Sequence, residues 1–167
     1  MSTVAEIEQR DQPRTRPLEI LLVFAHHPTA LQTFLPWAST LALEGVLPKP
    51  DAELLALRTA WNCRSEFEWG HHVDYARAAG LTDDEIARIP HGADVEGWTS
   101  RQQALLRAAD QLHDNTDIDD AAWAALREHL DEAQLVEVAL VVGQYTMLSM
   151  VANSCGVELE AGHDRLP

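Results

Sequence analysis

Three ionisable side chains suited to proton transfer occur close together in the sequence: Glu53, Glu68 and His72. Residues three or four positions apart share one face of a helix, so Ser65, Glu68 and His72 are expected to line up. A carboxylate one turn before an imidazole can fix the tautomer of the ring and raise its basicity. We therefore predict that Glu68 and His72 form a general acid/base pair. Glu53 joins them as a proton relay if the chain bends near residues 62–64.

The same spacing has a simpler interpretation, because Glu–His pairs four residues apart are common as surface ion pairs on solvated helices. The setting favours a pocket instead. Trp61, Phe67 and Trp69 give the motif an unusually aromatic neighbourhood. Trp69 is therefore a candidate substrate-binding residue, and Ser65 is a candidate hydrogen-bonding residue.

Other residues are candidates for the remainder of this pocket. An anionic substrate needs a cation, and Arg58, five residues after Glu53, is the candidate anion-binding residue. The alternative for Arg58 is a salt bridge on the helix face or between subunits. His27 is a candidate for the pocket wall or a partner of a helix end. Tyr145 lies in an apolar segment, where its hydroxyl needs a partner, and it faces either the pocket or the core.

A metal site is the less favoured interpretation of the histidines. The adjacent pairs His26–His27 and His71–His72 point about 100° apart on a helix, and they lack the HxxxH spacing of a zinc helix. Glu68 and His72 with His27 from another helix would supply two imidazoles and one carboxylate. The spacing of the histidines therefore favours a site with no metal.

The charge of the chain limits its partners. Its 167 residues include 12 Lys and Arg against 27 Asp and Glu, for a formal net charge of −15. Such a chain repels phosphate backbones and anionic lipid surfaces, so we expect neither nucleic acid nor membrane as a partner. The N-terminal residues carry no apolar run of the kind found in signal peptides, and we expect a cytoplasmic protein.

Helical periodicity runs through most of the chain, and no strand alternation of useful length occurs. Residues 1–16 are expected to form a flexible arm, and residues 17–167 a single all-α domain. Asp51, Thr82, either Thr99 or Ser100, and Asp131 are predicted helix caps. Residues 135–151 are apolar on nearly every helix face, which predicts burial against another subunit. We therefore expect a homo-oligomer (a dimer, trimer or hexamer) that binds a small-molecule substrate.

The pattern Glu53-x11-Ser65-x2-Glu68-x3-His72 resembles the carboxymuconolactone decarboxylase family, within the AhpD-like (alkylhydroperoxidase-D-like) superfamily. Peroxidase members carry Glu-x11-Cys-x2-Cys-x3-His, so Ser65 and Glu68 stand where the two cysteines would be. The segment Phe67-Glu68-Trp69-x2-His72 is similar to the version in cysteine-free members. The resemblance spans residues 18–158 and implies an AhpD-like helical fold.

The resemblance implies a cofactor-free lyase, a decarboxylase or a related proton-transfer enzyme that acts on a small organic acid. The first alternative is a thiol-dependent peroxidase, which needs a reactive thiol and a resolving partner. Cys63 precedes the first motif position by two residues and falls on the opposite helix face, and Cys155 is remote in sequence. The second alternative is a non-catalytic binding or assembly protein of the same fold.

Overall fold

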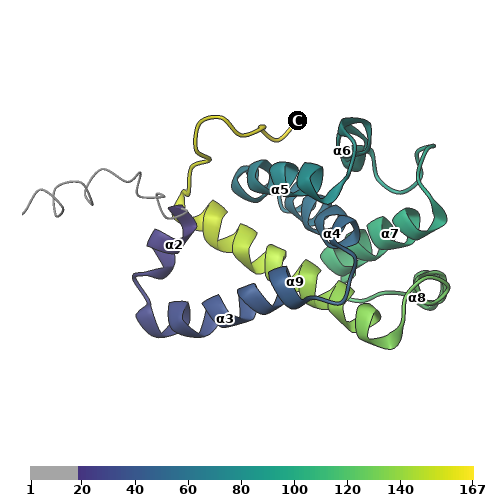
Figure 1. Ribbon diagram of the computed structural model, residues 1–167, viewed down its shortest axis with the longest axis horizontal. Helices are drawn as coiled ribbons and strands as arrows, with labels where there is room; N and C mark the ends of the chain where they lie inside the picture. The colour runs from purple at the N-terminus through teal and green to yellow at the C-terminus, as the bar shows by residue number, and fades with distance from the viewer. Residues whose placement is uncertain (1–18) are drawn as a thin grey trace, which may run out of the picture.

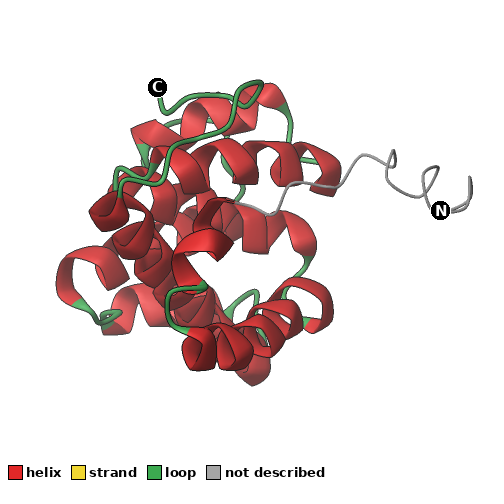
Figure 2. Ribbon diagram, turned by 90° about the vertical axis from the view of Figure 1, so that its left-hand side faces the viewer, coloured by secondary structure: helices red, strands yellow, loops and turns green. Residues whose placement is uncertain are grey.

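The computed structural model describes residues 19–167, and within that range the chain is helical, with no strands (Figure 2). The predicted arm at residues 1–16 lies outside the described residues. The elements are α2 (Glu19–Phe24), α3 (Pro28–Glu44), α4 (Lys49–Asn62), α5 (Glu66–Ala79), α6 (Asp83–Arg88), the 3₁₀ turn η1 (Ile89–His91), α7 (Ser100–Asn115), α8 (Asp120–Arg127) and α9 (Glu132–Cys155).

Most helix starts follow the capping residues seen in the sequence. Thr82, Thr99 and Asp131 each form a complete capping box with the residue three positions later. These reciprocal bonds satisfy backbone N–H groups that have no partner inside the helix. The three predicted caps are confirmed.

Asp51 is an exception, because it does not cap α4. The helix begins earlier, at Lys49, where the prolines on either side suit a first helical turn. Asp51 lies inside that turn and is buried, and its carboxylate accepts hydrogen bonds from the Arg101 guanidinium. Asp51 therefore links α4 to the start of α7 and does not act as a helix cap.

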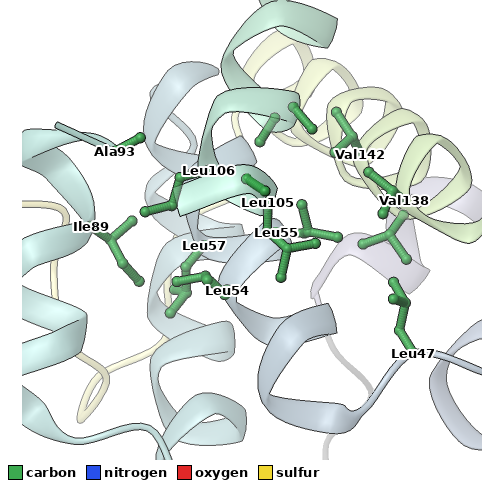
Figure 3. Packing of buried hydrophobic residues seen from close by; sticks show 14 of the residues in the cluster. Leu47, Leu54, Leu55, Leu57, Ile89, Ala93, Leu105, Leu106, Val138 and Val142 are labelled. Carbon is green, nitrogen blue, oxygen red and sulfur yellow. The ribbon is translucent and has the colours of Figure 1, made fainter. Parts of the chain in front are cut away.

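The main core lies between α4, α7 and α9 (Figures 1 and 3). Figure 3 shows Leu54, Leu55 and Leu57 of α4 meeting Leu105 and Leu106 of α7, with side chains of α9 completing the cluster. All five leucines are almost fully buried. Because α4 sits at the centre of this core, the residues that it carries toward α5 are held on a rigid element.

By length and composition, α9 is apolar enough to cross a membrane. Half of its most apolar window is buried inside the molecule, and the helix contacts α2, α4, α5, α7 and α8. These contacts are those of a core helix.

Helix α3 is apolar, yet it has no buried residue. Its main contacts are with α2, and it lies at the edge of the bundle (Figure 1). Pro36 does not end the helix. The connector from α3 to α4 is fastened by the buried carboxylate of Glu137, which accepts hydrogen bonds from the backbone N–H groups of Val46 and Leu47.

Candidate functional site

The site forms where the chain bends between α4 and α5. Arg64 adopts a left-handed conformation with φ of 52°, and the next helix starts immediately after Ser65. The bend predicted near residues 62–64 is therefore present, and α4 and α5 lie side by side (Figure 1). It allows a residue early in α4 to face a residue in the middle of α5.

Glu53 and His72 meet across this helix pair. Oε2 of Glu53 lies 2.6 Å from Nδ1 of His72, and the side chains are 17% and 7% exposed. When Nδ1–H donates to the carboxylate, the other ring nitrogen, Nε2, carries the lone pair. The arrangement orients the ring and leaves Nε2 able to accept a proton.

Glu68 lies on the other side of the ring. Its Oε2 is 3.7 Å from Nε2 of His72, and its side chain is 5% exposed. Burial raises the pKa of the Glu68 carboxyl, and the nearby His72 partly opposes that shift. Burial thus shifts this carboxyl toward its protonated form, next to the nitrogen that can exchange a proton with it.

Two connected hollows lie beside this trio. One has a volume of about 490 Å³ and is lined by Glu53, the other has about 360 Å³ and is lined by Glu68, and His72, Tyr75 and Tyr145 line both. The remaining walls are mainly aliphatic side chains of α3, α5 and α9, including Leu41, Leu43, Ala78, Ala79, Val141 and Leu148. A small apolar molecule with one or two polar groups suits such a cavity.

Two tyrosines frame the imidazole. The ring of Tyr145 stands edge-on to His72 at 4.3 Å between centroids, and that of Tyr75 does so at 5.4 Å. Burial, reinforced by the charge of Glu53, raises the pKa of both phenols. Both hydroxyls therefore stay protonated and can donate hydrogen bonds to a bound ligand.

The cation that lines the cavity is Lys49, not Arg58. Lys49 is exposed and lies one helical turn before Glu53; its ammonium donates to the carbonyl of Ala42. The spacing of four residues from Glu53 was a signal that sequence reasoning missed. Arg58 lines neither hollow. Its Nε and Nη2 bind Asp110 of α7 at 2.6 and 2.9 Å, so it forms a structural salt bridge, as in the alternative interpretation, but between two helices of the same chain.

The structure also places three other predicted residues away from the cavity lining. His27 caps α3, where its Nδ1 accepts from the N–H of Ala30 at 3.3 Å. Trp69 is buried in the core against Trp61. Ser65 caps α5 by accepting from the N–H of Glu68. Ser65 and Trp69 position the site, since the cap and the core contact fix the start of α5. None of the three residues lines the hollows.

Comparison with known proteins places these residues in a family. The model of the carboxymuconolactone decarboxylase family matches residues 28–111, half of the chain, and this match includes Glu53, Glu68 and His72. The chain belongs to this family. No curated protein matches the sequence.

Solved structures with the same fold include AhpD-like proteins. One is a peroxidase-related protein from Ralstonia eutropha with an alkylhydroperoxidase AhpD core, at 20% identity and a TM-score of 0.78 over 93% of this chain and 83% of that one. Another is an Agrobacterium tumefaciens protein of unknown function, described as a candidate antioxidant defence protein AhpD, at 18% identity and a TM-score of 0.76 over 83% and 95%.

A third similar structure is the debrominase Bmp8, as a cysteine-to-alanine variant in complex with 2,3,4-tribromopyrrole. It is 13% identical, with a TM-score of 0.76 over 96% of this chain and 90% of that one. At these identities the similarity shows that this chain has the AhpD-like fold. This fold was expected from the sequence.

The cysteines of this family member lie apart from the Glu53–His72 pair. Sγ of Cys63 is 3.8 Å from Nδ1 of His113, and Cys155 is exposed at the end of α9. Burial raises the pKa of the Cys63 thiol, although Thr146 and Ser149 partly oppose the shift. A raised pKa reduces the thiolate fraction and with it the reactivity of the sulfur.

Proposed function

We propose that this protein is a cofactor-free proton-transfer enzyme, of the decarboxylase or lyase type, that acts on a small organic acid. The observation that carries the proposal is the 2.6 Å contact between Glu53 and Nδ1 of His72 at the wall of an apolar cavity. A carboxylate that orients an imidazole in this way is a recurrent means of producing a competent general base or acid.

The roles follow from the positions of the three groups. Glu53 orients the ring through Nδ1, Nε2 of His72 exchanges the proton with the substrate, and Glu68 holds a proton in reserve beside Nε2. In a decarboxylation, the bond between the α-carbon and the carboxylate breaks and its electron pair forms a dienolate. Glu68 passes its proton to Nε2 of His72, and Nε2 delivers it to that carbon as carbon dioxide leaves. The hydroxyls of Tyr75 and Tyr145 are available to stabilise the enolate oxygen.

The cavity suggests how an acid would be bound. Lys49 is the cation at its wall, while the carboxylate of Glu53 repels a second negative charge. A monoanionic acid with an apolar body therefore fits better than a dianion. Loss of carbon dioxide from an apolar site is favoured, because the charge of the carboxylate becomes dispersed as the bond breaks.

We further propose that a second copy of this chain covers α3 and closes the cavity. In a single chain the cavity wall formed by α3 is open, and Trp37 and Leu43 are 42% and 78% exposed on that helix. Val136 and Met150 on α9 are also exposed. Apolar surface of this kind is typical of subunit interfaces, and a homo-oligomer would exclude water from the proton transfer.

The test is turnover of a panel of γ-lactone acids and β-keto acids, measured as carbon dioxide release. The parent protein should accelerate release from at least one acid, and His72→Gln should lose at least a hundredfold in kcat/KM. His91→Ala, at an exposed position on η1, is the matched control. A panel without turnover, in which one acid still raises the melting temperature, would instead favour the non-catalytic binding protein.

The peroxidase alternative is tested with the same preparation. Reduction of a hydroperoxide by the parent that disappears in a Cys63→Ser, Cys155→Ser double variant would contradict the proposal. The separation of Cys63 from His72 and its raised pKa favour the opposite result.

A further inference from the structure

A second group of metal-binding side chain types lies next to the proposed proton-transfer site. It joins α5 to the segment that follows α9. His71 comes from α5, while Glu160 and His163 come from residues 157–167. One ligand atom from each of the three residues lies within 4.8 Å of the others.

We propose that His71, Glu160 and His163 bind one divalent transition-metal ion, and that Zn²⁺ is the ion that fits best. Two imidazoles and one carboxylate are a common zinc ligand set and leave a fourth position for water. This set differs from the combination of Glu68, His72 and His27 considered from the sequence, and the position of His27 at the α3 cap does not support that combination.

The distances suit a single ion. Nε2 of His71 lies 2.9 Å from Oε2 of Glu160, and two ligands of a tetrahedral zinc ion are about 3.3 Å apart. The rings of His71 and His163 are 4.4 Å apart between centroids. Only small side-chain rotations are therefore needed to bring three donors to one centre.

The carboxylate of Asp74, which is not a proposed ligand, holds the ring of His163 in an orientation suited to metal binding. Oδ2 of Asp74 lies 2.8 Å from Nδ1 of His163. A hydrogen bond at Nδ1 leaves Nε2 as the nitrogen that can bind a metal, and such carboxylate–histidine–metal arrangements orient the ligand ring and raise its basicity.

The C-terminal segment is held in position over α5 by other contacts. A Cβ added to Gly70 would lie 2.5 Å from a methyl carbon of Leu159, so the segment approaches the helix as closely as glycine permits. Arg77 pairs with Asp164 at 2.6 Å and Arg165 with Glu66 at 2.9 Å. The site therefore exists as part of the folded chain, and the ion would fasten this segment beside His72.

The experiment is a titration of the tag-free, chelator-treated full chain with Co²⁺, followed by displacement with Zn²⁺. The visible absorption of tetrahedral cobalt should saturate at one ion per chain and disappear when Zn²⁺ is added. His163→Ala should abolish this spectrum, Asp74→Asn should weaken binding about tenfold, and His91→Ala should bind like the parent.

A separate measurement shows whether the His163→Ala variant keeps its fold. His163 lies in the C-terminal segment, so the far-ultraviolet circular dichroism of His163→Ala without metal should match that of the parent. Parent-like cobalt binding by His163→Ala would overturn the proposal. Loss of binding in His72→Gln with retention in His163→Ala would overturn it as well, because the ion would then lie in the proton-transfer cavity.

Discussion

Oε2 of Glu53 lies 2.6 Å from Nδ1 of His72, and this contact joins the first half of α4 to the middle of α5. The two residues are 19 positions apart in the chain. They meet because residues 63–65 end one helix and start the next, so that the two helices lie side by side. The carboxylate thereby determines which nitrogen of the ring is free.

The first prediction concerns the tautomer of His72. In the parent protein, Nδ1 should carry the proton and Nε2 the lone pair, because Glu53 accepts from Nδ1–H. Replacement of Glu53 by Leu should shift the ring toward the Nε2–H form. The measurement is ¹⁵N NMR of imidazole-labelled protein, and an unchanged tautomer in Glu53→Leu would show that the contact does not orient the ring.

The second prediction concerns the pH dependence of stability. Burial raises the pKa of Glu68 above 4.5, the ordinary value for a glutamate, so the folded state binds more protons than the unfolded state above that pH. The free energy of unfolding therefore falls as the pH rises from 4.5 through the raised pKa. Glu68→Gln should gain stability relative to the parent over that interval.

This second prediction is measured by urea unfolding of the parent and Glu68→Gln across a pH series. Glu66→Gln, on the more exposed side of the same helix, is the control. A constant difference between the parent and Glu68→Gln at every pH would contradict a raised pKa.

The third prediction separates the two roles considered for Arg58. Its guanidinium is 11% exposed and binds Asp110 in a bidentate manner. Arg58→Met should lower the free energy of unfolding by about 3 kcal/mol, because the carboxylate loses its partner. Arg107→Met, which breaks the exposed pair with Asp94, should have little effect. Equal effects of the two variants would refute a structural role for Arg58.

The fourth prediction concerns assembly. Multi-angle light scattering of the parent should give a mass above that of one chain, and Trp37→Glu should lower it by placing a charge on the exposed face of α3. Thr33→Glu is not a suitable control, because the substitution would also remove the hydrogen bonds that the Thr33 hydroxyl donates to the backbone of α3. Glu44→Gln, at the exposed end of α3, is more suitable. A monomeric parent would contradict the proposed second copy.

The sequence predicted much of the fold because its signals were local. Capping boxes such as Thr82–Glu85 involve neighbouring residues and need no tertiary information. The convergence of Glu53 on the same pocket also followed, since a bend at residues 62–64 was the one condition. The sequence had assigned the tautomer of His72 to Glu68, however, and the structure places Glu53 at Nδ1 instead, because the bend brings α4 against α5. Asp51 was misplaced because tertiary pairing with Arg101 outweighed its tendency to cap.

The rest of the site depends on packing between distant segments. Arg58 was selected by its charge and its closeness to Glu53 in sequence, but its partner Asp110 is 52 residues away. His163 is 92 residues from His71 in the sequence, and it approaches His71 only because the C-terminal segment returns over Gly70. The hydrophobic periodicity of one helix does not indicate which distant segment of the chain packs against it.

The most direct test of the central claim is solvent-proton exchange at carbon. β-Keto acids and γ-lactone acids are incubated in deuterium oxide, and deuterium at the carbon next to the carbonyl is followed by ¹H NMR. The account predicts that the parent and His91→Ala catalyse incorporation into at least one acid or its decarboxylated product, and that His72→Gln loses at least a hundredfold of that rate. Incorporation by His72→Gln at the parent rate would contradict it.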